Sequence, residues 1–204
     1  MPESTGYPTS DAQQQAHALL DAAIQASLAD HADQALALLC DSIGQFHVNP
    51  RAHYLLGAEY AQRQRYGDAV MHMTIAIDQA PDMAVARLQL SLLWLTLGNP
   101  TSASAQLGPL LELPADQALG RFARALACIC NGDVPAAQAE LTAGLALGTD
   151  NQPLMADMRR LLSALEGGAQ PEAVAGQAAA APAGPAQVSH GMAISVYTGN
   201  ASDN

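Results

Sequence analysis

The sequence contains no lysine, so all eight of its basic residues are arginine, against 19 acidic residues and a net charge of −11. A protein that binds nucleic acid needs a cationic surface that displaces counterions from the phosphates. Anionic membrane surfaces attract proteins through similar basic clusters. The charge balance therefore disfavours nucleic acids and membrane surfaces as partners.

Aromatic and charged residues are also scarce, at 4% and 13% of the 204 residues, whereas half of the residues are hydrophobic. β-Branched residues are sparse, and the helix formers alanine and leucine dominate. The chain is long enough for one domain with a full hydrophobic core. We therefore expect an all-α fold.

Long apolar runs are missing as well. The most apolar stretch, Leu88 to Leu97, is too short to span a bilayer and is interrupted by polar residues. Residues 1–6 contain neither a basic region nor an apolar run, so we expect no signal peptide and no membrane insertion. Three cysteines are an odd and low count for a disulfide framework. These absences predict a cytoplasmic protein with reduced thiols.

A repeat with a period of 34 residues organises the chain, because three columns of residues recur at this spacing. The columns are Ala35, Ala69, Ala103 and Ala137; Leu39, Met73, Leu107 and Leu141; and Gln64, Gly98 and Gly132. Columns that share one period indicate tandem copies of one structural unit. Small residues would let two helices approach closely, and large residues would fill the space between neighbouring units.

The unit is clearest between Pro50 and Met83. At fixed offsets it contains His53, Leu56, Gly57, Tyr60, Tyr66, Ala69, Met73, Ala76 and Pro81. This pattern resembles the tetratricopeptide repeat, with His53 in place of its Trp and Met73 in place of its Phe. The resemblance covers about residues 10–166 and implies an α-solenoid, a right-handed superhelix of antiparallel helix pairs.

Helix signals agree with this organisation. Asn49 and Asn99, each followed by proline, are expected N-caps, as are Ser10, Asp82 and Asp133. We predict helix pairs at 10–29 and 33–44, 50–63 and 67–79, 83–97 and 100–112, and 115–131 and 134–147. A last helix at 152–166 would close the open end of the stack.

The predicted division of the chain begins with a disordered N-terminus at 1–9 and a repeat domain at 10–166. The repeats lie at about 10–49, 50–83, 84–117 and 118–151, followed by the capping helix at 152–166. That helix is expected to carry Asp157, Arg159, Arg160 and Glu166 on its polar side. Residues 167–187 have the Ala, Gly and Pro content of a flexible linker, and 188–204 form a tail.

The fourth unit departs most from the pattern. Arg121 and Arg124 occupy positions where large apolar residues belong, and Pro114 comes one residue early. These departures predict that the first helix of this unit is rotated relative to the others.

The sequence contains no candidate catalytic, cofactor or metal site. Cys128 and Cys130 are two residues apart, so on a helix they point to different faces and are expected to be structural. The six histidines, at 17, 31, 47, 53, 72 and 190, lack metal-ligand spacing. Phosphate-binding glycine loops and nucleophile elbows are absent. We therefore predict that the protein is not an enzyme and uses no cofactor.

The helix predicted at 83–97 carries two apolar stripes. One is predicted to fill the repeat interior and comprises Ala86, Leu90, Leu93, Trp94 and Leu97. The other is predicted to line a concave partner-binding groove and comprises Val85, Leu88, Leu92 and Leu95. In the fourth unit Leu119, Phe122, Leu126 and Ile129 have similar spacing and belong either to the groove or to the core. In the second unit the groove is predicted to be mixed and more polar, and it comprises Arg51, Tyr54, Ala58 and Gln62.

A lysine-free, aliphatic groove favours an apolar or amphipathic protein segment over an acidic carboxylate, which related domains clamp with lysines. The leading hypothesis is an adaptor or chaperone from a bacterial cytosol, similar to the small tetratricopeptide chaperones of secretion systems. The alternative is a structural homo-oligomer, in which the apolar stripe is a self-interface or the resting site of the protein's own tail.

The tail returns to apolar residues after the linker. Met192, Ile194 and Val196 alternate with small residues, so one side of an extended strand would be apolar, and Tyr197 follows. A flexible linker of this length spans about 25 Å, enough to reach the groove, another subunit or a partner. We predict that 190–198 dock; the alternative is a frayed tail with chance hydrophobic residues.

Overall fold

The computed structural model describes residues 10–168, and within this range the chain forms nine α-helices and no strand. The helices are α1 (Ser10–Leu28), α2 (Ala32–Gln45), α3 (Pro50–Gln62), α4 (Tyr66–Gln79), α5 (Ala84–Thr96), α6 (Pro100–Leu111), α7 (Ala118–Cys130), α8 (Val134–Leu147) and α9 (Gln152–Glu166). Every helix end lies within three residues of the predicted position. The all-α prediction is confirmed.

The 34-residue period of the sequence is also the period of the helices. The first helices of successive pairs begin at Pro50, Ala84 and Ala118, and α9 begins one further step along, at Gln152. The second helices α2, α4, α6 and α8 begin at the same interval. Helix α9 therefore occupies the place of the first helix of a further unit.

Four helices begin at polar caps. The side chains of Asn49, Asn99, Asp133 and Asn151 each accept a hydrogen bond from the backbone N–H three residues later, and each is followed by proline in the first turn. The expected cap at Asp82 is wrong, because α5 begins after Met83, which makes no side-chain cap bond.

The turn inside each pair explains the column of Gln64, Gly98 and Gly132. These residues have φ values of 60°, 67° and 75°, and Asp30, one period earlier, has 64°. Each lies in the left-handed region that ends a helix, where glycine carries no steric cost. The chain thus reverses direction between the two helices of each pair through a residue with a left-handed backbone conformation.

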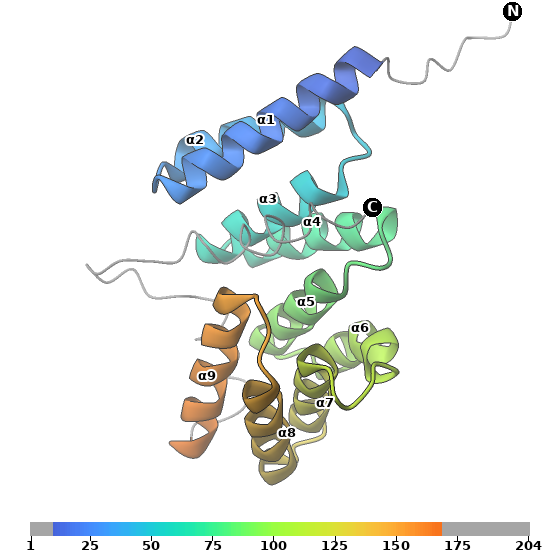
Figure 1. Cartoon of the computed structure of the whole chain (residues 1–204), viewed down its shortest axis with the longest axis vertical. Coiled ribbons are helices and arrows are strands. Elements are labelled where there is room, and N and C mark those ends of the chain that lie inside the picture. Colours follow the sequence, from blue (N-terminus) through green and yellow to red (C-terminus); the bar gives the residue numbers. More distant parts are fainter. Residues whose placement is uncertain (1–9, 169–204) are drawn as a thin grey trace, which may run out of the picture.

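Consecutive helices pack as pairs, and the pairs stack in one direction from α1–α2 at one end to α8 and α9 at the other (Figure 1). Alanines at the repeated position are fully buried; they are Ala35, Ala69, Ala103 and Ala137. Gly57 shows why small residues are needed, since a Cβ there would lie 3.1 Å from the Ala69 carbonyl oxygen and 2.7 Å from Met73 Cγ.

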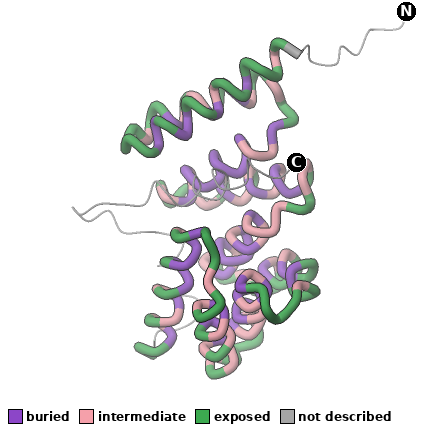
Figure 2. The backbone as a smooth tube through the Cα atoms, in the orientation of Figure 1, coloured by how far each residue is buried: buried purple, intermediate pink, exposed green. Residues whose placement is uncertain are grey.

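Two hydrophobic clusters fill the stack and meet at α5. Ala86, Leu90 and Leu93 belong to an N-terminal core with α1 to α4, whereas Leu88, Leu92 and Leu95 belong to a C-terminal core with α6 to α9. Figure 2 shows buried positions along the sides of the helices that face their neighbours. No helix among residues 10–168 has the length and apolar character needed to cross a membrane.

Candidate interaction surface

The structure buries most of the residues that were predicted to line an open groove. The exposed fractions are 0% for Tyr54, 1% for Leu88, 5% for Leu92, 4% for Leu95, 0% for Phe122 and Leu126, and 5% for Ile129. Val85 and Leu119 are half-buried. Most of these side chains therefore pack in the hydrophobic clusters of the described chain, and a role in partner binding stays a prediction.

The period of the stack gives the physical reason for this burial. The buried residues form three columns, Tyr54, Leu88 and Phe122; Ala58, Leu92 and Leu126; and Ala61, Leu95 and Ile129. In α9 the same columns hold Ala156, Arg160 and Ser163, which are exposed or half-buried. Since no helix pair follows α9 in the described chain, these columns mark the face that each first helix turns toward the next unit.

The two stripes of α5 are thus both core. One belongs to the cluster before it and the other to the cluster after it, and α5 contacts α7 directly. For the fourth unit the sequence left two alternatives, groove or core. The structure favours core for Phe122, Leu126 and Ile129. The expected interior residues Trp94 and Leu97 are less enclosed, because Trp94 is half-buried and Leu97 is 43% exposed at the C-cap of α5.

A row of half-buried side chains remains on the first helices. Arg51, Val85 and Leu119 occupy one column in α3, α5 and α7, and we call them the first-helix row. A second half-buried column contains Gln62, Thr96 and Cys130. Between α3 and α5, the Tyr54 hydroxyl donates to Oε1 of half-buried Gln89 at 2.7 Å. This surface is mixed, with aliphatic residues toward the C-terminal units.

The predicted rotation of α7 is not seen. Its buried positions Phe122, Leu126 and Ile129 match Leu88, Leu92 and Leu95 of α5 at the common period. The helix instead begins three residues later than expected, after a turn at 112–117.

The two arginines of α7 form ion pairs with α8 and hydrogen bonds with the turn before α7. Arg121 Nη1 lies 3.1 Å from Glu140 Oε2 on α8, and Arg124 Nε lies 3.5 Å from the same oxygen. Arg121 Nε donates to the Ala115 carbonyl at 2.8 Å, and Arg124 Nη1 donates to the Leu113 carbonyl at 3.2 Å. The guanidinium groups therefore bind the turn at 112–117, after which α7 begins.

Helix α9 does not carry all its charges on one polar side. Arg159 and Glu166 are exposed as expected, but Asp157 is only 2% exposed and makes an ion pair with Arg160. Burial raises the pKa of Asp157 to about 7, although the nearby charge and hydrogen bond of Arg160 oppose this shift.

A histidine pair was missed by the sequence analysis. His53 of α3 and His72 of α4 place their Nδ1 atoms 3.0 Å apart. Burial is the main cause that lowers the pKa of both rings. The two residues are 19 positions apart on facing helices, so no local spacing could reveal the contact.

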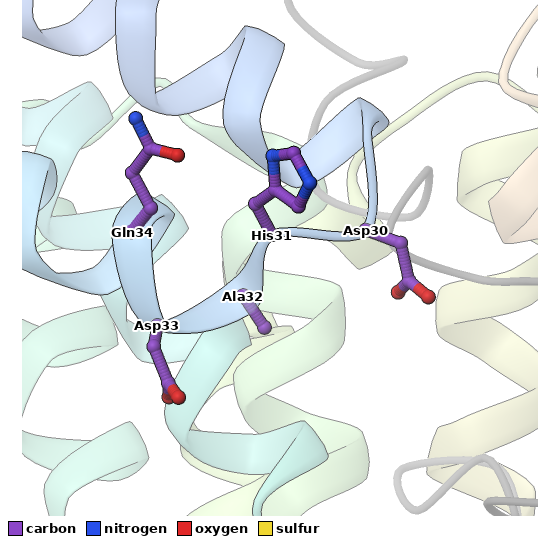
Figure 3. A pocket seen from close by; sticks show the side chains of 5 residues that line it. All are labelled: Asp30, His31, Ala32, Asp33 and Gln34. Carbon is purple, nitrogen blue, oxygen red and sulfur yellow. The ribbon is translucent and has the colours of Figure 1, made fainter.

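The described residues contain no group of three metal-ligand side chains. Cys128 and Cys130 are half-buried free thiols, and burial raises the pKa of both, which disfavours the reactive thiolate. A shallow surface pocket lies at the α1–α2 turn, lined by Asp30, His31, Ala32, Asp33 and Gln34. Figure 3 shows that its polar side chains point apart, and Asp33 is paired with Arg63.

The tail-docking residues Met192, Ile194, Val196 and Tyr197 lie outside the described residues, as do the predicted linker beyond Gly168 and the N-terminal segment 1–9. Their docking role stays a prediction.

No protein-family model matches the sequence, and no curated protein matches it. Among solved structures, the chain is similar to a tetratricopeptide repeat protein from Parabacteroides merdae ATCC 43184, with a TM-score of 0.59 and 13% sequence identity. The match covers 80% of this chain and 62% of that one, less than two thirds of its length. This likeness shows the fold, and the predicted tetratricopeptide-like α-solenoid is confirmed.

Proposed function

We propose that the chain is a non-enzymatic interaction module that binds a segment of another protein along its first-helix row. The observation that carries this proposal is the row itself, Arg51, Val85 and Leu119, repeated at the period of the helices on three successive units. A linear ligand can contact equivalent positions in turn, which suits extended or helical segments.

The chemistry of the row favours an amphipathic segment. Val85 and Leu119 offer aliphatic contacts, while Arg51 and Gln62 supply polar groups in the second unit. With a net charge of −11, the protein attracts a partner with basic residues more readily than an acidic one. An adaptor or chaperone of a bacterial cytosol, which shields such a segment before it reaches its final partner, fits these properties.

The test uses the full chain to capture partners from the native host, followed by calorimetric titration of each purified partner. The double variant Val85→Glu and Leu119→Glu places two charges on the aliphatic part of the row. The matched control is Met71→Glu on the second helix α4, where the side chain is already 48% exposed. Circular dichroism serves to check that both variants are as helical as the wild type.

We expect the row variant to bind about tenfold more weakly or worse, a loss of about 1.4 kcal/mol, and the control to bind like the wild type. Equal dissociation constants for all three proteins would exclude the row as the binding surface. Light scattering addresses self-association: a mass near twice 21.1 kDa that the row variant reduces would indicate a homodimer interface instead.

A further inference from the structure

The imidazole rings of His53 and His72 meet between α3 and α4. Their ring centroids are 5.3 Å apart at an interplanar angle of 26°, and the two Nδ1 atoms are 3.0 Å apart. A neutral imidazole has one N–H and one acceptor nitrogen, so one Nδ1 donates to the other. When both rings are protonated, two N–H groups and two positive charges face each other and the hydrogen bond is lost.

The surroundings limit access of water to the pair. His53 is only 6% exposed, and the half-buried His72 ring stacks on Tyr60 of α3 with centroids 5.5 Å apart. The Arg65 guanidinium lies 4.5 Å from the centroid of the Tyr60 ring. Burial in this site disfavours the charged form of both rings, and local separation of α3 from α4 would relieve this cost by admitting water.

The charged groups around His53 and His72 do not offset the cost of protonating both rings. The α2–α3 loop supplies His47, whose backbone hydrogen bond favours a charged His53 while its ring charge opposes it. Helix α4 supplies Asp68, which favours charge on His72 but is already paired with Arg65 at 2.7 Å.

Two further charged residues, one on α3 and one on α5, make hydrogen bonds with other partners. Glu59 of α3 accepts a hydrogen bond from Ser27 of α1 at 2.9 Å, and Arg87 of α5 donates to the Pro81 carbonyl at 3.0 Å. For both histidines, desolvation outweighs the charges that favour protonation, so both pKa values lie below the ordinary histidine value.

We propose that His53 and His72 form a proton-sensitive latch, which holds α3 against α4 near neutral pH and releases this helix pair as the pH falls. The latch concerns the stability of the second unit, so it holds whether or not a partner binds there. Because α3 carries Arg51 of the first-helix row, its release would also change the proposed binding surface.

The sign follows from proton linkage. Unfolded histidine has a pKa of about 6.5, and both folded pKa values lie lower, so the unfolded state binds more protons in between. The stabilisation is complete above about pH 6.5 and is lost as the pH falls through the folded pKa values. With two such histidines, the unfolding constant rises up to about 100-fold per pH unit in this window.

The first experiment measures urea unfolding of the full chain between about pH 5 and pH 8, where both the histidines and Asp157 change charge; the Asp157 contribution is shared by all the variants compared. The variants are His72→Gln, which keeps a polar group but does not titrate, and His31→Gln, a control at an exposed histidine. We expect His72→Gln to reduce the pH dependence by up to about tenfold per pH unit, and the control His31→Gln to have a clearly smaller effect. Equal pH dependence of His72→Gln and wild type would overturn the latch.

A second measurement uses the wild-type protein and tests the proposal even if His72→Gln does not fold. NMR titration of the wild-type histidine ring protons, together with amide hydrogen exchange corrected for intrinsic rates, reports the pair directly. We expect the two rings to titrate below the ordinary histidine pKa of about 6.5, and exchange of α3 and α4 to rise before that of α7 and α8. Titration of both rings at the ordinary histidine value, or uniform exchange of all four helices, would also overturn the proposal.

Discussion

Truncation of Leu92 and Leu95 on α5 tests whether the second apolar stripe is core or surface. Both leucines are almost fully buried, at 5% and 4% exposure, within the C-terminal core. Removal of a buried leucine side chain leaves a cavity that neighbouring helices fill only in part. We therefore expect each alanine substitution to destabilise the protein.

The expected magnitude is about 2–5 kcal/mol for each leucine. The two side chains lie one turn apart and share neighbours, so their effects need not add. Even so, the double variant should lose a large part of the roughly 5–15 kcal/mol that stabilises an ordinary domain. The control is Leu97→Ala at the C-cap of α5, where the side chain is 43% exposed. It should change stability by only about 0.5 kcal/mol.

The assay is urea unfolding followed by circular dichroism at a helical wavelength, for the wild type, the two single variants, the double variant and Leu97→Ala. If Leu92→Ala together with Leu95→Ala unfolds at the wild-type urea concentration, both side chains must be open in solution. The interpretation as core would then be refuted, and the predicted groove would be restored.

At Gly144, an added Cβ would lie 2.5 Å from Phe122 Cε1, so Gly144→Ala should cost about 1–3 kcal/mol. Gly44→Ala in α2, where an added Cβ has nothing within 4 Å, should instead add about 0.5–1 kcal/mol; equal urea midpoints would contradict this contrast. At Asp157 the folded pKa of about 7 exceeds the unfolded value, so wild-type stability should fall as the pH rises toward 7. Asp157→Asn should not show this loss, so above pH 7 its free energy of unfolding should exceed that of the wild type by on the order of a few kcal/mol. The measurement is urea unfolding as a function of pH, and parallel stability profiles of the two proteins would contradict the prediction.

The helices could be predicted because their signals are local and repeat. The Asn-Pro pairs at Asn49 and Asn99 form caps as expected, and the columns of small and large residues are buried in each pair. The left-handed turn column was visible as Gln64, Gly98 and Gly132, although Asp30 shows that the backbone shape does not require glycine.

The surface could not be predicted as well, because a stripe of apolar residues does not reveal what covers it. Leu88, Leu92 and Leu95 have the spacing of a groove, but the same spacing serves contacts with the next unit. The informative comparison is within the chain, at α9, where the same columns carry Ala156 and Ser163 and both are exposed. That comparison requires the helix register, which only the structure supplies.

The buried titratable groups of α3–α4 and α9 respond to pH in opposite directions. Protonation of His53 and His72 destabilises the second unit as the pH falls, whereas loss of the proton from Asp157 destabilises α9 as the pH rises. In a solenoid each unit depends mainly on its neighbours, so the two effects act on different parts of the stack. Acid should therefore loosen the N-terminal core first, while base should loosen the cap over the C-terminal core first.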